Sequence, residues 1–102
     1  MSRFDIFVNP NQAATHVLYV DVQSDFVRLS TRWCIPLQRH VPSRPIVQGA
    51  QALIEVDQHE YVMDTANLLA VPAVLLRQRA GRLSSSEQLS AESCIEFMLR
   101  GY

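Results

Sequence analysis

The stretch that decides the fold is residues 84–102, which read SSSEQLSAESCIEFMLRGY. Ser84 is followed three residues later by Glu87, which is the spacing of a capping box, where each side chain bonds the other residue's backbone N–H. Gly101 is a typical helix stop because glycine tolerates a positive φ. We therefore predict one amphipathic helix that begins after Ser84 and continues to Gly101.

At about 100° per residue, one face of this helix collects most of its apolar side chains. The residues of that stripe are Ala91, Cys94, Ile95, Met98 and Tyr102, with Leu99 at its edge. This face is expected to pack on a core. Arg100 points away from the stripe and lies one turn after Glu96, in the order that favours an i,i+4 ion pair. Arg100 is therefore expected to stand in water at the tip of the helix.

Six short segments rich in β-forming residues precede the helix. They are residues 4–8, 17–22, 32–37, 52–56, 60–64 and 71–76. Residues 57–59 predict a hairpin between two of these strands, and residues 65–69 predict a short helical turn. Pro36 has no N–H for a sheet ladder, so it predicts an edge strand or a bulge. Six strands followed by one helix favour an α+β, mainly β fold, an antiparallel barrel-like sheet with a helix packed on it.

Length and composition favour a single domain, residues 1–102, because 48% of the residues are hydrophobic, which is enough for a core. The net charge of −1 provides no long-range attraction to nucleic acid or to a membrane. Cys34 and Cys94 fall in apolar patterns and are expected to be reduced core thiols. No secretory signal and no membrane-spanning run is recognisable, so a cytoplasmic protein is expected.

The sequence contains no motif of a common catalytic site. Its three glycines form no phosphate-binding loop. His16, His40 and His59 have no metal-ligand spacing with each other or with the cysteines. Each histidine is expected to bond a neighbour or to face solvent, and no metal, cofactor or enzymatic activity is expected.

Two features allow more than one interpretation. Asp21 and Asp25 are close enough in sequence to act as paired carboxylates, although capping of an Asx-type turn explains them at least as well. Trp33, beside Arg32, could stack on a ligand, although a lone tryptophan in an apolar strand usually belongs to the core.

Four pieces of the chain together resemble the CcdB family of toxins from toxin–antitoxin modules. They are VDVQSD at residues 20–25, IPL at residues 35–37, VPAV at residues 71–74, and the helix that ends in Gly101 and one bulky residue. The order of elements agrees along essentially the whole chain, while residues 38–49 match poorly.

The resemblance implies a fold and an activity. The fold is an SH3-like β-barrel of the kind shared with MazF-type toxins, with a long C-terminal helix, in a homodimer whose two helices lie near the dyad. The activity is not enzymatic catalysis. CcdB-like toxins bind the DNA gyrase A subunit and trap gyrase on cleaved DNA, and a CcdA-like antitoxin neutralises them by folding a disordered segment onto the toxin dimer.

The resemblance also implies the residues of the site. The implied gyrase-binding residues are Phe26, Val27, Glu96, Leu99, Arg100, Gly101 and Tyr102, and the residues implied for dimer or core packing are Cys94, Ile95 and Met98. Gly101 matches the family's terminal triplet. Arg100 and Tyr102 stand where the best-known plasmid toxin has tryptophan and isoleucine.

Two alternative functions stay open at this point. One is a MazF-type endoribonuclease on the same barrel, for which Arg28, Arg32 and Asp25 are candidate residues, although no spacing singles them out. The other is a degenerate toxin that binds an antitoxin but no longer poisons gyrase, which the differences at Arg100 and Tyr102 motivate.

Overall fold

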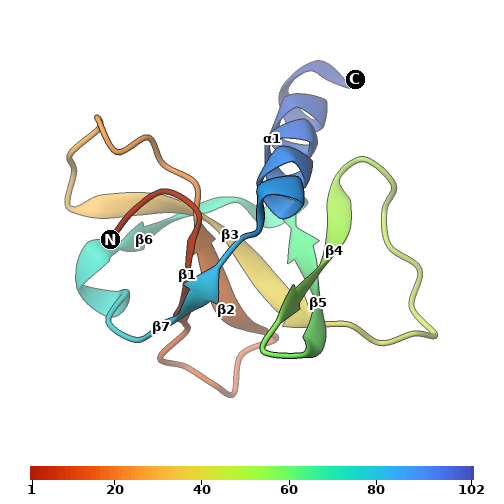
Figure 1. Ribbon diagram of the computed structural model, residues 1–102, viewed down its shortest axis with the longest axis horizontal. Helices are drawn as coiled ribbons and strands as arrows, with labels where there is room; N and C mark the ends of the chain where they lie inside the picture. Colours follow the sequence, from red (N-terminus) through yellow and green to blue (C-terminus); the bar gives the residue numbers. More distant parts are fainter.

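The computed structural model describes residues 1–102, which form a seven-stranded antiparallel sheet and one long helix (Figure 1). The strands are β1 (Asp5–Val8), β2 (His16–Asp21), β3 (Thr31–Arg39), β4 (Gln51–Val56), β5 (His59–Asp64), β6 (Leu69–Pro72) and β7 (Arg79–Arg82). Two short 3-10 helices, η1 (Thr65–Asn67) and η2 (Ala73–Leu75), flank β6, and the helix α1 (Ser85–Arg100) comes last. The predicted α+β, mainly β class is confirmed.

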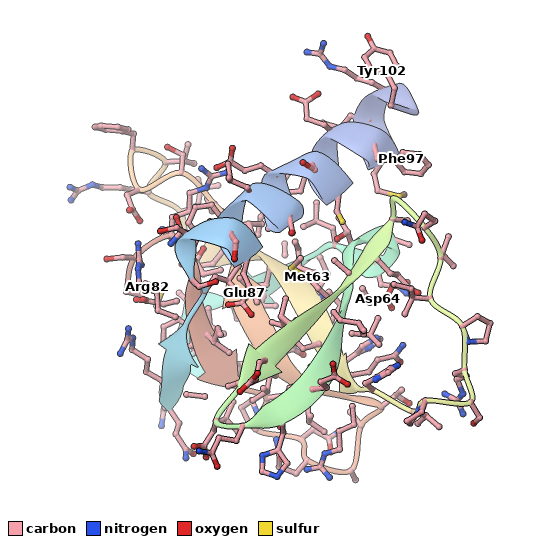
Figure 2. The ribbon with its side chains drawn as sticks, turned by 45° about the vertical axis from the view of Figure 1, so that its right-hand side comes forward. Met63, Asp64, Arg82, Glu87, Phe97 and Tyr102 are labelled. Carbon is pink, nitrogen blue, oxygen red and sulfur yellow. The ribbon has the colours of Figure 1, made fainter.

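The sheet curls into an SH3-like half-barrel around the core. Its strands lie in the order β4-β5-β3-β2-β1-β7, and β6 pairs with the other side of β3. Thirteen buried residues fill the inside of the curl, among them Ile6, Val20, Ile35 and Met63. Figure 2 shows Met63 inside the curl, beneath the helix. Neighbouring residues of a strand point to opposite faces. Cys34 accordingly belongs to a second, smaller cluster, while Ile35 belongs to the main core.

The central strand β3 explains the position of Pro36. Along one side, β3 pairs with β2. Along the other side, residues 31–34 pair with β6 and residues 37–39 pair with β5, so Ile35 and Pro36 lie in the gap between the two partners. Of the two predicted alternatives, the edge strand was therefore wrong, because the missing N–H of Pro36 is accommodated at an interruption within a central strand. An irregularity of the kind expected from the bulge alternative lies close by, where the register with β2 shifts opposite Leu37 and Gln38.

The hairpin between β4 and β5 is confirmed and has a two-residue turn. Val56 pairs with His59, and the two turn residues, Asp57 and Gln58, have φ of 51° and 66°. Two consecutive positive φ values are typical of the type I′ turn, whose twist matches that of the flanking strands.

The segment before the helix differs from the sequence prediction. The expected strand at residues 71–76 ends at Pro72, where β3 pairing stops, and η2 follows it. The strand β7 was not predicted because its sequence, RAGR, has no apolar alternation. It forms through long-range pairing with β1, and Arg79 and Arg82 both form ion pairs with Asp5, at 3.3 and 3.2 Å.

The capping box at the start of α1 is confirmed. The Glu87 N–H donates to Ser84 Oγ at 3.3 Å, and the Ser84 N–H donates to Glu87 Oε1 at 2.9 Å. The second carboxylate oxygen of Glu87 accepts the backbone N–H of Glu55 in the edge strand β4, at 3.0 Å. One side chain therefore caps the helix and fixes its first turn to the sheet (Figure 2).

The apolar stripe of α1 is buried only in its first half. Ala91 and Cys94 are buried, and Ile95 is half-buried against the main core. Met98 is 46% exposed and Tyr102 is 82% exposed, so the expected core packing does not extend to the end of the helix. The reason is visible in Figure 1, where the last turns of α1 project beyond the sheet.

Three smaller observations complete the comparison with the sequence. Cys34 and Cys94 are buried free thiols, as predicted, and burial raises the pKa of Cys34 to about 12. Trp33 is 56% exposed, so the preferred assignment to the core was wrong: it lies near the start of β3, opposite the exposed Ala70 of the short strand β6. No helix is both long enough and apolar enough to span a bilayer.

Candidate partner-binding site

The free end of α1 presents apolar side chains to solvent. Leu99 is 78% exposed, and Tyr102 is still more exposed. Gly101 adopts a left-handed conformation with φ of 80°, and its N–H bonds the Phe97 carbonyl at 2.7 Å. We call residues 96–102 the helix tip. Because nothing of this chain covers Leu99 and Tyr102, they are available to a partner.

The polar side of the helix tip carries the predicted ion pair. Arg100 Nε lies 2.9 Å from Glu96 Oε2, and both side chains are more than half exposed. An exposed i,i+4 pair of this kind contributes only about 0.3–0.5 kcal/mol. The ion pair therefore holds Arg100 only weakly, and Arg100 can exchange Glu96 for a carboxylate of a partner.

The helix tip is held by a contact that the stripe did not predict. A Cβ added at Gly49 would lie 2.9 Å from the ring of Phe97, so the ring lies directly against the Gly49 backbone. Gly49 also has a φ of +89°, which favours glycine. Figure 2 shows Phe97 pointing from α1 toward this loop. The available signal in the sequence was an aromatic residue outside the stripe together with a lone glycine in a loop.

The loop between β2 and β3 is a second exposed feature. We call residues 22–30 the contact loop. Phe26 is 97% exposed and Val27 is 45% exposed. The Phe26 N–H bonds Ser24 Oγ at 3.2 Å, and the Val27 N–H bonds the Ser24 carbonyl at 3.0 Å. These bonds form a tight turn that directs the Phe26 side chain outward.

A buried charged group lies under the contact loop. Arg32 donates through Nε to Asp21 Oδ2 at 2.8 Å and through Nη2 to Asp25 Oδ1 at 3.2 Å. Asp21 is fully buried and also accepts the Gln23 N–H at 3.1 Å, as in an Asx turn. Burial raises the pKa of Asp21, and the Arg32 guanidinium opposes that rise. The turn-capping interpretation of Asp21 is confirmed. The two carboxylates do come together, but as joint acceptors of Arg32.

The residues considered for a ribonuclease partly converge at the same place. Asp25, Arg28 and Arg32 line a hollow of about 530 Å³. Arg32 and Asp25 are bonded to each other, however, and Arg32 is buried with its charge matched by Asp21. This arrangement is typical of a structural ion pair rather than of a guanidinium poised over a phosphate.

Arg3 connects the contact loop with the helix. Its backbone N–H donates to Asp25 Oδ1 at 3.0 Å, and its Nε donates to the Val22 carbonyl at 3.0 Å. Its Nη1 lies 3.6 Å from Glu92, which is one helical turn before Glu96. The base of the contact loop and the outward face of α1 therefore belong to one side of the molecule.

The histidines have partners, as predicted. The bonded pairs are His16 with Asp64 and His40 with Glu60, each at 3.0 Å, and His59 with the Asp57 carbonyl at 2.8 Å. No group of three or more His, Cys, Asp or Glu side chains is arranged to hold a metal ion.

Among the partners of the histidines, the Asp64 carboxylate accepts the most hydrogen bonds. Its carboxylate accepts hydrogen bonds from Asn67 at 2.7 Å and Gln51 at 3.1 Å, besides the bond to His16. Burial by itself raises the pKa of Asp64, but these three bonds outweigh it and hold the pKa below its ordinary value of 3.8. Gln51 in turn accepts the Val47 N–H at 2.9 Å, so Asp64 supports the loop that carries Gly49.

Comparison with known families decides the assignment. A family model described as CcdB protein matches residues 3–101. The chain belongs to the CcdB family. Membership makes it a toxin of a toxin–antitoxin module. No curated protein matches this CcdB-family chain.

The structure places the residues that the resemblance implied for gyrase binding in two groups. Glu96, Leu99, Arg100, Gly101 and Tyr102 all lie in the helix tip, and Phe26 and Val27 lie in the contact loop. Within one chain the two groups do not meet: in Figure 1 the loop between β2 and β3 projects at the upper left, apart from the C-terminal end of α1. The residues assigned to packing divide as well, since Cys94 is buried, Ile95 is half-buried and Met98 is exposed.

Proposed function

We propose that this CcdB-family toxin binds the DNA gyrase A subunit and traps the complex of gyrase with cleaved DNA. The observation that carries the proposal is the helix tip, where Leu99 and Tyr102 stand exposed at the free end of a helix that projects from the sheet. The toxin acts by binding rather than by catalysing a reaction.

The chemistry of the helix tip suits a protein partner. Burying apolar surface contributes roughly 25 cal/mol per Å², and aromatic side chains such as Tyr102 are frequent hot spots of interfaces. Arg100 adds a donor for carboxylates, and its bond to Glu96 is weak enough to be exchanged. The tip therefore combines an apolar anchor with one adaptable charge, as a specific interface requires.

We further propose a homodimer with the C-terminal helices near its dyad, and a CcdA-like antitoxin that neutralises it. The exposure of Met98, on the core side of α1, supports pairing with a second copy. Pairing of two copies would also give one assembly two helix tips and two contact loops. Because gyrase acts on DNA in the cytoplasm, we infer a cytoplasmic location. Light scattering of the purified chain tests the dimer.

The experiment that tests the function uses gyrase from the host of this chain. Purified toxin is expected to inhibit supercoiling and to accumulate cleaved DNA. Deletion of Gly101 and Tyr102 is expected to abolish both effects and growth arrest, while the chain stays folded because neither residue packs on the core. Inhibition that survives the deletion would contradict the assigned site.

The same preparations distinguish the alternative functions. Cleavage of RNA by the pure protein, with no effect on gyrase, would replace the proposal with a ribonuclease. Expression in the native host without growth arrest, together with antitoxin binding, would indicate a degenerate toxin. The proposal requires growth arrest and intact RNA.

A further inference from the structure

Gln23 ties the contact loop to the sheet. Its side chain is buried and bonded at both ends of the carboxamide. Oε1 accepts the Trp33 N–H of β3 at 3.0 Å, and Nε2 donates to the Val27 carbonyl at 2.9 Å. A buried amide that makes both bonds is costly to disturb, because each lost bond leaves a desolvated partner.

Asp25 provides a second tie, directly before Phe26. Its Oδ1 accepts both the Arg3 N–H at 3.0 Å and Arg32 Nη2 at 3.2 Å. The same Arg32 nitrogen lies 3.3 Å from the Gln23 carbonyl. The chain on both sides of Phe26 is therefore tied to β3, before it by the Asp25 side chain through Arg32, and after it by the Val27 carbonyl through Gln23.

These ties are unexpected for a loop whose central side chain has no packing partner. Phe26 is almost fully exposed, so packing of its own side chain does not fix the loop. Ordering a free loop costs about 1–2 kcal/mol per residue, and a partner that binds a disordered loop must supply that free energy. In this chain the bonds of Gln23 and Asp25 supply it during folding.

We propose that Gln23 is a positioning residue for partner binding. Its carboxamide presets the contact loop, so that Phe26 and Val27 meet gyrase in the binding conformation without an ordering cost. This inference rests on the proposed gyrase function, and it adds a buried residue that touches no partner to the residues that determine affinity.

The test compares two glutamine variants. Gln23→Glu keeps the acceptor for the Trp33 N–H and replaces the donor with an oxygen that faces the Val27 carbonyl. Gln12→Glu is the control for the loss of an amide donor. Gln12 is exposed in the loop between β1 and β2, and its Nε2 likewise donates to backbone carbonyls, those of Asn9 at 2.6 Å and of Val17, in β2, at 3.0 Å. Calorimetry gives the Kd of each folded chain for the gyrase A subunit.

The two variants are expected to differ in their Kd for the gyrase A subunit. Gln23→Glu is expected to weaken binding by about tenfold or more, because the loop must be ordered on binding. Gln12→Glu is expected to change Kd by less than about twofold, even where it lowers the melting temperature as much. Hydrogen exchange of the Val27 amide is expected to accelerate in the first variant and not in the second.

A second pair of variants keeps the test valid should Gln23→Glu not fold. The Asp25 side chain is half exposed, and Asp21 still neutralises Arg32 when Asp25 is changed. Asp25→Ala removes the acceptor and is expected to weaken binding, whereas Asp25→Asn retains an acceptor oxygen and is expected to restore most of the affinity.

The outcomes separate this inference from the function on which it rests. A wild-type chain that binds gyrase, with an unchanged Kd in Gln23→Glu, overturns the positioning role alone. Equal weakening in Gln23→Glu and Gln12→Glu also overturns it, because general destabilisation then explains both. A wild-type chain that does not bind gyrase overturns the proposed function and the positioning role together.

Discussion

The helix tip and the contact loop both present apolar side chains to solvent, but different interactions hold them. The tip depends on the helix itself: a capping box at Ser84, a glycine cap at Gly101, and one brace between Phe97 and Gly49. The contact loop depends on the buried side chains of Arg32 and Gln23, which come from β3 and from the loop's own base. Apart from the brace, local signals thus build the helix tip, whereas a buried polar network shared with β3 holds the contact loop.

This difference has an energetic consequence. The exposed bonds of the tip contribute tenths of a kcal/mol each, because water competes for them. The buried bonds of the loop are made where water is excluded, so loss of one partner leaves an uncompensated polar group. A mutation in the network is therefore expected to cost more stability than one in the tip, although both affect the same proposed function.

The largest expected effect tests the network directly. Asp21→Ala leaves the buried Arg32 with only the half-exposed Asp25 as its counter-charge, and we expect a loss of about 3 kcal/mol of unfolding free energy. Asp21→Asn is the matched variant, because it retains an acceptor for Arg32 Nε and is expected to lose less. Urea unfolding measures both. A loss below about 1 kcal/mol for Asp21→Ala would contradict the importance of the buried pair.

The next effect tests the brace of the helix tip. Gly49→Ala places a Cβ 2.9 Å from the Phe97 ring and forces a side chain into a φ of +89°. We expect a loss of about 1–3 kcal/mol, measured by urea unfolding.

Gly101→Ala is the control for the brace. Gly101 has a similar φ, +80°, but nothing lies within 4 Å of its added Cβ. The loss of unfolding free energy in Gly101→Ala is expected to be smaller than in Gly49→Ala, since the added Cβ causes backbone strain but no clash. Equal losses at the two positions would show that the contact with Phe97 contributes nothing.

These two regions also explain what could be predicted from the sequence. The helix, its cap at Ser84 and its stop at Gly101 follow from spacings of a few residues, and all three are confirmed. The exposure of Arg100 follows from helical phase in the same way. Where the stripe ends could not be predicted, because the length of sheet beneath α1 is a tertiary property.

Only part of the polar network under the contact loop could be predicted from the sequence. Asp21 and Asp25 were noticed because they are close in sequence, but their common partner Arg32 belongs to the next strand, and only strand register brings it to them. Gln23 was noticed only as part of the VDVQSD stretch, and its burial gave no signal, since a glutamine that will be buried looks like any polar loop residue. The strand β7 could not be predicted either, because it forms by pairing with β1 and its own sequence has no strand pattern.

A fall in pH is expected to weaken the hydrogen bonds of Asp64 that support the loop carrying Gly49, and so to weaken the brace of the helix tip. The pKa of Asp64 is below its ordinary 3.8 in the folded chain, so its stabilising contribution is complete above that value. It is lost as pH falls through the folded pKa, because the unfolded chain then binds the proton more readily. Urea unfolding between pH 6 and about pH 3 measures this loss.

The variant Asp64→Asn is the control for the pH experiment. It cannot titrate, so it is expected to have a shallower decline in stability over the same range. Because Gln51 links Asp64 to Val47, hydrogen exchange in the Val47–Gln51 turn is expected to accelerate on acidification of the wild type. An equal pH dependence in the two proteins would assign the decline to other carboxylates.

The smallest expected effect concerns the ion pair of the tip. Arg100→Ala is expected to change unfolding free energy by at most about 0.5 kcal/mol, because its bond to Glu96 is exposed. Urea unfolding at low and high salt measures the change, and the small difference from wild type is expected to vanish at high salt. A loss above about 1 kcal/mol would mean that the tip, like the contact loop, relies on its polar contacts. If the unfolding free energy is unaffected while gyrase inhibition falls, Arg100 acts on the partner and not on the fold. The comparison of the two regions predicts this result, because the polar contacts of the helix tip are exposed and those of the contact loop are buried.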